Sequence, residues 1–331
     1  MKDPIAERGK YLMMSASFIV GIVLTMICPR GVSAIVDFPI GYSSRGGAYA
    51  FISLVDQQQL LEQEGIRANF IYVGGPQISH ALISGDIRMA ILGPVTPLRA
   101  AAQGTDIRFI GGVTERESAS LMADPKIAAA VGLKGTRLAI DRLGDTSDFR
   151  ARKVLEALGL EAQKDVTLLQ AGGQTARFAA LKAGHAQSTI VDPPLTLVGR
   201  KMGFRELVKL TQLDFPSGAA SIAVLKTTID KQPKELQAIM NAIARALRLY
   251  KTDKDVAIRG LGRFMQLSDR EALEETWRAY AESYKDIPSP SVAGIKIVKD
   301  FLAQTDPNLR KLEMDKIIDA RFTSKLPTQT K

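Results

Sequence analysis

Hydrophobic and polar positions follow one another along this chain in blocks that predict strands and helices in turn. Between Ile71 and Pro94, a short apolar run leads through a Gly-Gly turn, a helical segment and a small-residue turn to a second apolar run. The same order returns about a hundred residues later, between Leu168 and Pro193. This period is too long for a solenoid, whose repeats span about 20–50 residues, so it predicts two lobes of similar build.

Each copy of this pattern is preceded by a further strand, polar loop and helix. Val36–Gly41 predicts a strand that leads through a loop rich in Ser and Gly into a helix reaching Glu64–Ile66. Thr136–Ile140 predicts the equivalent strand, followed by Asp141–Ser147 and a helix reaching Leu158–Leu160. Strands alternating with helices predict parallel sheets, in which ligands bind at the carboxyl ends of the strands, near the reversal of strand order.

Two turn-rich segments divide the chain into an outer part and an inserted part. The first is Ala123–Pro125 and the second is Asp214–Gly218. We therefore expect lobe I to comprise residues 35–123 and 219–331, with residues 124–218 inserted as lobe II. Because the chain crosses twice between its lobes, we expect the two crossings to act as a hinge rather than as a flexible linker.

Beyond Thr228 the pattern becomes helical. Pro233–Tyr250 presents apolar residues on one face at helical spacing, and Asp269 is suited to cap a later helix. These helices carry no metal-binding or nucleophile motif, so we expect them to cover one lobe and its hinge. The other elements expected outside the repeats are strands at Arg108–Gly112, Ser118–Met122 and Ala220–Leu225 and helices at Val256–Met265, Arg270–Tyr284, Ser289–Gln304 and Glu313–Ala320.

The N-terminal segment has the pattern of an export signal. A basic region precedes the apolar run Tyr11–Cys28, and Val32–Ala34 fits a small-residue cleavage site, so residues 1–34 are predicted to be a Sec-type signal peptide. The run is 18 residues long and reaches the lower limit for a membrane span, which leaves an uncleaved anchor as the alternative. Cys28 is the only cysteine, so cleavage after Ala34 would leave an exported chain without a disulfide framework.

Composition and motifs narrow the function classes. The chain has 44 Lys and Arg against 35 Asp and Glu, but these charges are interleaved along helices, which favours a solvated basic surface over nucleic-acid binding. It has two histidines, His80 and His185, and no metal, nucleophile or phosphate-loop motif. We therefore predict no catalytic residue, no metal and no cofactor, and a binding function rather than an enzyme.

The loops that follow the strands hold the candidate ligand contacts. Small residues in Tyr42–Tyr49 let backbone N–H groups approach a ligand at a helix N-terminus, although an N-cap in a tight turn is the alternative. Arg142 lies in the equivalent loop of the second copy and can bind a carboxylate, sulfonate or phosphate; an ion pair with Asp145 or Asp148 is its alternative. Two helix N-termini and Arg142 predict an anionic ligand, whereas the acids nearby leave a cationic ring open.

Taken in order, these segments resemble the substrate-binding proteins of ABC transporters of the aliphatic-sulfonate and thiamine-precursor (pyrimidine) type. The resemblance covers nearly all of the mature chain, and its specificity lies in the ordered series rather than in one motif. It implies an α/β fold of the periplasmic-binding-protein type II, with two lobes joined by two crossings and a helical C-terminal part packed on lobe I. The matching segments are Ile40–Ala50, Glu64–Gly75, Ala81–Ile91, Leu133–Leu160, Lys164–Gly173 and Ala179–Pro194.

The resemblance implies a monomeric periplasmic protein that binds no nucleic acid and delivers a small organic, sulfonate- or carboxylate-like nutrient to an ABC permease in the inner membrane. The alternatives are a membrane-anchored ligand sensor or adaptor and an enzyme on the same fold. Thiamine-pyrimidine synthases share that fold but depend on a cysteine-rich metal segment, which this chain lacks. Arg45 adds charge to a loop that is commonly small and polar in the family, which leaves the ligand open. The implied ligand-binding residues are Ser43, Ser44, Gly47, Tyr49, Gly75, Gln77, Pro94 and Thr96 from one lobe and Arg142, Thr146, Gly173, Gln174 and Asp192 from the other.

Overall fold

The computed structural model describes residues 35–74, 77–213 and 218–326. By its internal contacts the chain divides into two units, Met1–Ile35 and Val36–Lys331, and the fold described below is that of the second unit. The expected signal peptide lies outside the described residues, as do residues 214–217 of the expected second crossing. Within the described ranges, no helix combines the length and the apolar character that a bilayer crossing requires.

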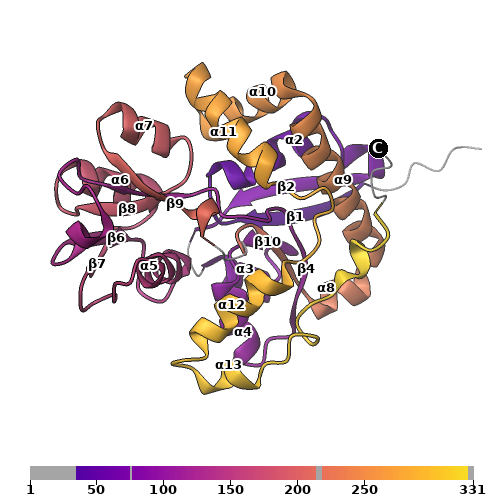
Figure 1. The fold of residues 1–331 in the computed structure, drawn as a ribbon. Helices are drawn as coiled ribbons and strands as arrows, with labels where there is room; N and C mark the ends of the chain where they lie inside the picture. Colours follow the sequence, from indigo (N-terminus) through magenta and orange to yellow (C-terminus); the bar gives the residue numbers. More distant parts are fainter. Residues whose placement is uncertain (1–34, 75–76, 214–217, 327–331) are drawn as a thin grey trace, which may run out of the picture. The chain divides into compact units, whose positions relative to one another are not determined.

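The first sheet contains five strands in the order β2-β1-β3-β10-β4 (Figure 1). β1 (Val36–Tyr42) lies parallel to β2 (Ile66–Tyr72) on one side and to β3 (Met89–Leu92) on the other. β10 (Ser221–Leu225) runs antiparallel between β3 and β4 (Ile107–Gly112). The chain leaves β1 for β2 and returns to form β3 on the opposite side, so strand order reverses between β1 and β3. The carboxyl ends of these two strands therefore form a topological switch point.

The second sheet repeats this order as β7-β6-β8-β5-β9. β6 lies parallel to β7 and β8, and β5 runs antiparallel between β8 and β9. Helices α3 (Gln77–Ser84) and α6 (Gln174–Lys182) stand at equivalent places in the two halves, so the internal repeat predicted from the sequence is confirmed. The strands of this sheet are β5 (Ser120–Ala123), β6 (Arg137–Ile140), β7 (Thr167–Gln170), β8 (Ser188–Val191) and β9 (Arg205–Lys209).

We call each sheet with the helices that follow its strands a lobe, the first lobe holding β1–β4 and β10 and the second holding β5–β9. The position expected for the first crossing, Ala123–Pro125, is wrong because β5 pairs with β8 and β9 of the second lobe. The chain instead changes sheets between Gly112 and Ser120. An apolar strand has the same pattern whichever sheet it joins, so the sequence could not assign β5.

The C-terminal helices pack mainly on the first lobe, as expected. α9 (Pro233–Thr252) begins with a proline, whose missing N–H costs nothing in the first turn, and its apolar face contacts α2 (Phe51–Gln57). The expected cap is confirmed, because Asp269 accepts from the backbone N–H groups of Glu271 and Ala272 at the start of α11. The remaining helices are α4 (Val95–Ala102), α5 (Thr146–Ala157), α7 (Leu195–Lys201), α8 (Lys226–Lys231), α10 (Lys254–Met265), α11 (Arg270–Ser283), α12 (Val292–Leu302) and α13 (Pro307–Lys311).

Two predicted helices are wrong. Glu313–Ala320 is not a helix: it runs beside β4, where Phe109 N donates to Ile317 O and Asp319 N donates to Phe109 O. The backbone groups on that edge of β4 require partners, and this demand outweighs the helical spacing of the apolar residues. The first helix is also shorter than expected, because α2 ends at Gln57 and Gln59 takes a positive φ of 49°. Glu62–Glu64 forms a separate short 3-10 helix.

Candidate functional site

The two switch points meet between the lobes. Ser43 N donates to Ile91 O over 3.0 Å and so joins the ends of β1 and β3. Gly93, the residue after β3, faces Thr146, the first residue of α5 in the second lobe; a Cβ on Gly93 would lie 2.7 Å from Thr146 Oγ1. The carboxyl ends of the first sheet thus lie against the loop and helix that follow β6.

Five residues gather at this junction, and we call them the central cluster: Tyr49, Glu117, Arg150, Asp192 and Tyr280. Arg150, on α5, forms an ion pair with Glu117 and lies 3.9 Å from Asp192. The side chain of Arg150 is 15% exposed and that of Glu117 is 6% exposed. Tyr49 and Tyr280 come from the first lobe and lie near enough for the charges of Arg150 and Asp192 to act on their hydroxyls. Both lobes therefore contribute to one polar centre.

Burial and neighbouring charges together set the pKa values of Tyr49 and Arg150. Desolvation raises the pKa of Tyr49 to about 12, although a 3.1 Å hydrogen bond with Ser43 Oγ opposes the rise. Burial by itself would lower the pKa of Arg150, but the charges of Glu117 and Asp192 outweigh it and raise that pKa. At neutral pH the tyrosine is a neutral hydrogen-bonding group and the arginine is charged.

Several of the predicted site residues converge on the central cluster. Tyr49 and Asp192 belong to it, and Ser43 binds the Tyr49 hydroxyl. Gln174 Oε1 accepts from Asp192 N over 2.8 Å and so fixes the loop after β8, next to Gly173 at the start of α6. Thr146 lies on the same helix as Arg150, one turn earlier. These residues form the part of the predicted site that the fold assembles.

Other predicted residues occupy structural positions. Gly47 is buried against Tyr280, and its carbonyl oxygen accepts from Tyr284 Oη over 2.8 Å. Ser44 Oγ accepts from Gly46 N over 3.0 Å, which is the tight-turn alternative considered for this loop. The positions of the rest are as follows: Gln77 is exposed at the start of α3, Pro94 is buried at the N-cap of α4, Thr96 is half-buried in α4, and Gly75 lies outside the described residues.

The structure gives Arg142 a surface position. Its side chain is 50% exposed and its Nε lies 3.9 Å from Asp141 Oδ1, rather than near either acid expected as its partner. Asp145 caps α5, because its side chain accepts from Ser147 N and Asp148 N. The start of α5 is thus satisfied by its own carboxylate, which removes one argument for an anionic ligand there.

Sequence reasoning missed Arg150, Glu117 and Tyr280. For Arg150 a signal existed, because it follows Thr146 by four residues and so shares its face of the helix. Glu117 and Tyr280 come from a segment between strands and from a C-terminal helix, and nothing local marks either. Among the described residues, no group of three or more His, Cys, Asp and Glu is placed to hold a metal ion.

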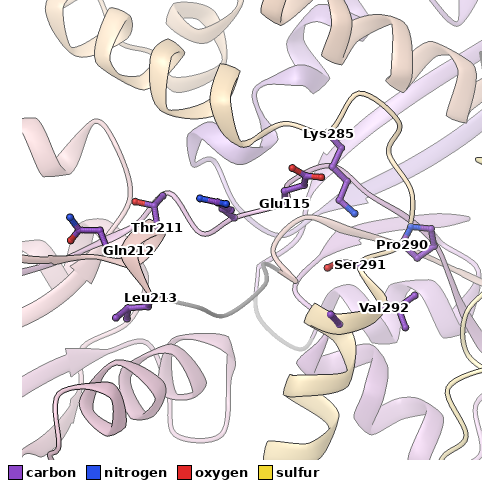
Figure 2. Close-up of a pocket in the computed structure, with 10 residues that line it drawn as sticks. Glu115, Thr211, Gln212, Leu213, Lys285, Pro290, Ser291 and Val292 are labelled. Atoms are coloured by element: carbon purple, nitrogen blue, oxygen red, sulfur yellow. The ribbon is translucent and has the colours of Figure 1, made fainter. Parts of the chain in front are cut away.

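A cavity of about 700 Å³ lies beside the segments that connect the lobes (Figure 2). Glu115, Thr211 and Lys285 are among its lining residues, and Lys285 Nζ donates to Ser289 O over 2.8 Å. A second cavity, of about 650 Å³, lies along α5 and α12. Neither lining includes a residue of the central cluster.

Contacts on several sides hold the lobes together. Arg99 Nη2 on α4 donates to Gly144 O over 3.0 Å, and the rings of Phe149 and Phe301 stack edge-on with centroids 5.2 Å apart. On another side, α7 of the second lobe contacts α11 of the first through charged side chains. The structure is thus a closed arrangement of the two lobes.

The two sheets have the same strand order, and each contains one antiparallel strand from the chain segment that crosses between the lobes. The two sheets face each other through their switch points. This arrangement is the periplasmic-binding-protein fold. Solved structures share it. A protein from Bordetella bronchiseptica RB50 superposes with a TM-score of 0.74 at 17% identity, covering 88% of this chain and 96% of that chain. The alkanesulfonate-binding protein SsuA from Xanthomonas axonopodis pv. citri, bound to MOPS, superposes with a TM-score of 0.68 at 23% identity, covering 85% of this chain and 96% of that chain. The aliphatic sulphonate-binding protein SsuA from Escherichia coli superposes with a TM-score of 0.65 at 21% identity, covering 89% of this chain and 94% of that chain.

The chain belongs to the NMT1-like family, whose model matches residues 93–259. No curated protein sequence matches it significantly. Most of the similar structures whose names state a role are binding proteins. The similar structures also include DszB in complex with biphenyl-2-sulfinic acid. The expected family resemblance and fold class are confirmed.

Proposed function

We propose that this protein is an extracytoplasmic solute-binding protein that passes a small organic solute to an ABC permease in the inner membrane. The observation that carries the proposal is the central cluster, where residues of both lobes meet at facing switch points. Such a site is completed only when the lobes close, so ligand binding changes the shape that a permease meets. The SsuA proteins that share the fold support a sulfonate-like ligand.

Arg150 is the group that we assign to an acidic ligand, in place of Arg142. It lies largely buried at the junction of the lobes, and its buried Nε has no hydrogen-bond partner among the described residues. A buried donor without a partner costs about 1–3 kcal/mol, which an acceptor on the ligand would recover. The ligand carries a single acidic group, because a second negative charge would lie close to Glu117 and Asp192.

A thermal-shift panel tests this assignment. The probes are MOPS, butanesulfonate and nitrate, compared with neutral and cationic heterocycles. We expect stabilisation by the sulfonates, loss of that shift in Arg150→Gln, partial recovery in Arg150→Lys, and an unchanged shift in the matched control Arg142→Gln. Circular dichroism of each variant separates lost binding from lost folding. Stabilisation by cations alone, or full sulfonate binding in folded Arg150→Gln, would contradict the proposal.

The enzyme alternative is tested with the same panel. Because DszB shares the fold, biphenyl-2-sulfinic acid is included as a probe and the solution is assayed for released sulfite. We expect no release, and a steady release would favour the enzyme. Light scattering of the purified protein is expected to give a monomer. The exported product is expected to begin at Ile35, whereas a membrane-bound product that retains Tyr11–Cys28 would favour the anchored sensor.

A further inference from the structure

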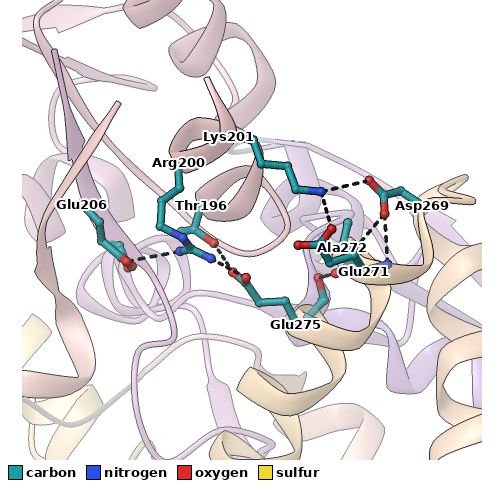
Figure 3. A network of polar contacts seen from close by, with 10 residues as sticks. Thr196, Arg200, Lys201, Glu206, Asp269, Glu271, Ala272 and Glu275 are labelled. Atoms are coloured by element: carbon teal, nitrogen blue, oxygen red, sulfur yellow. Dashed lines mark hydrogen bonds and ion pairs between the residues drawn. The ribbon is translucent and has the colours of Figure 1, made fainter. Parts of the chain in front are cut away.

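A network of charged side chains joins α7 of the second lobe to α11 of the first (Figure 3). Arg200 Nη2 donates to Glu275, and Arg200 Nη1 donates to Glu206 Oε2 on β9 over 3.2 Å. Thr196 Oγ1 donates to Glu275 Oε1 over 3.2 Å. Glu275 thus receives two hydrogen bonds from the other lobe.

The Arg200–Glu275 contact lies at the surface, next to a buried threonine. The side chains of Arg200 and Glu275 are 35% and 26% exposed, and Thr196 is buried. Glu206 is in turn held by Ser120 Oγ, which donates to it over 2.6 Å, so Arg200 is positioned before it meets Glu275. A pre-positioned arginine and a second hydrogen bond from Thr196 make this contact stronger than an isolated surface ion pair. The neighbouring pair of Lys201 with Glu271, 2.6 Å apart, is more exposed.

We propose that the Arg200–Glu275 contact is a latch that stabilises the closed arrangement and so sets ligand affinity without touching the ligand. The inference rests on the proposed solute-binding function, because closure affects affinity only if the ligand binds between the lobes. Separating the lobes breaks both contacts to Glu275, whereas the contact between Arg200 and Glu206 lies within the second lobe and survives. Apparent affinity falls in proportion to the closed fraction, so a weaker latch weakens binding.

The closed fraction can be followed by energy transfer between dyes on the two lobes. Lys182→Cys on α6 and Lys234→Cys on α9 provide exposed positions, and Cys28→Ser removes the native cysteine. We expect Glu275→Gln to lower the closed-to-open ratio by about 1.5- to 5-fold. The Kd for MOPS or butanesulfonate should rise in proportion to the fall in the closed fraction. Raising salt from about 0.05 M to about 0.5 M should open the unsubstituted protein more than the variant.

Matched variants locate the effect. Glu274→Gln changes the adjacent residue, which pairs with Arg270 and Lys254 within the first lobe, and should leave both measurements unchanged. Arg200→Ala combined with Glu275→Gln should be no worse than Arg200→Ala by itself, because the two residues act through one contact.

The outcomes separate the latch from the proposed function. An unchanged closed fraction in Glu275→Gln, or additive effects of the two substitutions, would overturn the latch. If the variants differ in closed fraction but no probe binds, the latch stands and the proposed ligand class fails. If every variant binds the probe as tightly as the unsubstituted protein, the latch fails and solute binding stands.

Discussion

Gly93→Ala should prevent full closure of the lobes while leaving each lobe folded. The added Cβ would lie 2.7 Å from Thr146 Oγ1, 3.4 Å from its Cγ2 and 3.5 Å from its Cβ. Because Gly93 belongs to the first lobe and Thr146 to the second, this overlap exists only when the lobes are closed. An open molecule accommodates the alanine without cost from this contact.

The expected loss of ligand affinity in Gly93→Ala follows from the overlap between the new Cβ and the Thr146 side chain. Ordinary contacts of a Cβ begin near 3.4 Å, so the alanine is several tenths of an ångström too close to Oγ1. Rotation of Thr146 gives little relief, because its β-branched side chain places a methyl or a hydroxyl group on either side. Overpacking of this kind costs about 1–3 kcal/mol, which corresponds to a roughly 5- to 150-fold loss of affinity if the closed state bears all of it.

Titration calorimetry with whichever sulfonate stabilises the unsubstituted protein measures this loss. Thr146→Ala removes both Oγ1 and Cγ2, so adding Gly93→Ala to that variant should cost little. Thermal unfolding without ligand should change by only a few degrees. An equal loss of affinity from Gly93→Ala in both backgrounds, or no loss in either, would refute the reasoning, because the predicted effect passes through the Thr146 side chain.

Two further predictions concern the first lobe. In Gly47→Ala the new Cβ would lie 2.2 Å from Tyr280 Cε2, so we expect destabilisation of about 1–3 kcal/mol in thermal unfolding, whereas Gly46→Ala, which meets only Ser44 Oγ at 3.3 Å, should be nearly neutral. For Tyr49, the fold favours the neutral hydroxyl over the ionised one. The contribution of this preference to the free energy of unfolding is therefore complete below pH 10 and falls as the pH rises toward the folded-state pKa of about 12. That span corresponds to about 2.7 kcal/mol. Denaturant titrations at pH 8 and at about pH 11 measure how much stability each protein loses between these two pH values. We expect Tyr49→Phe to lose less than the unsubstituted protein. An equal loss in the two proteins would contradict this prediction.

Local patterns are sufficient for most elements of the fold. The two copies of strand, helix and strand, the loops at the carboxyl ends and the amphipathic C-terminal helices follow from hydrophobic periodicity and turn residues. Because the carboxyl ends of parallel strands meet at one edge of a sheet, the same patterns also place Gln174 near Asp192 in the second lobe.

Only the tertiary structure decides which charges meet. Arg142 and Arg150 lie eight residues apart, and the sequence gives both the same chemistry. Packing leaves Arg142 half exposed beside Asp141 and largely buries Arg150 against Glu117 and Asp192. The sheet that β5 joins was likewise open, because its apolar pattern suits either sheet. Periodicity along the chain reports which face of an element is buried, but the partner of a buried group is set by residues distant in sequence, which local pattern does not encode.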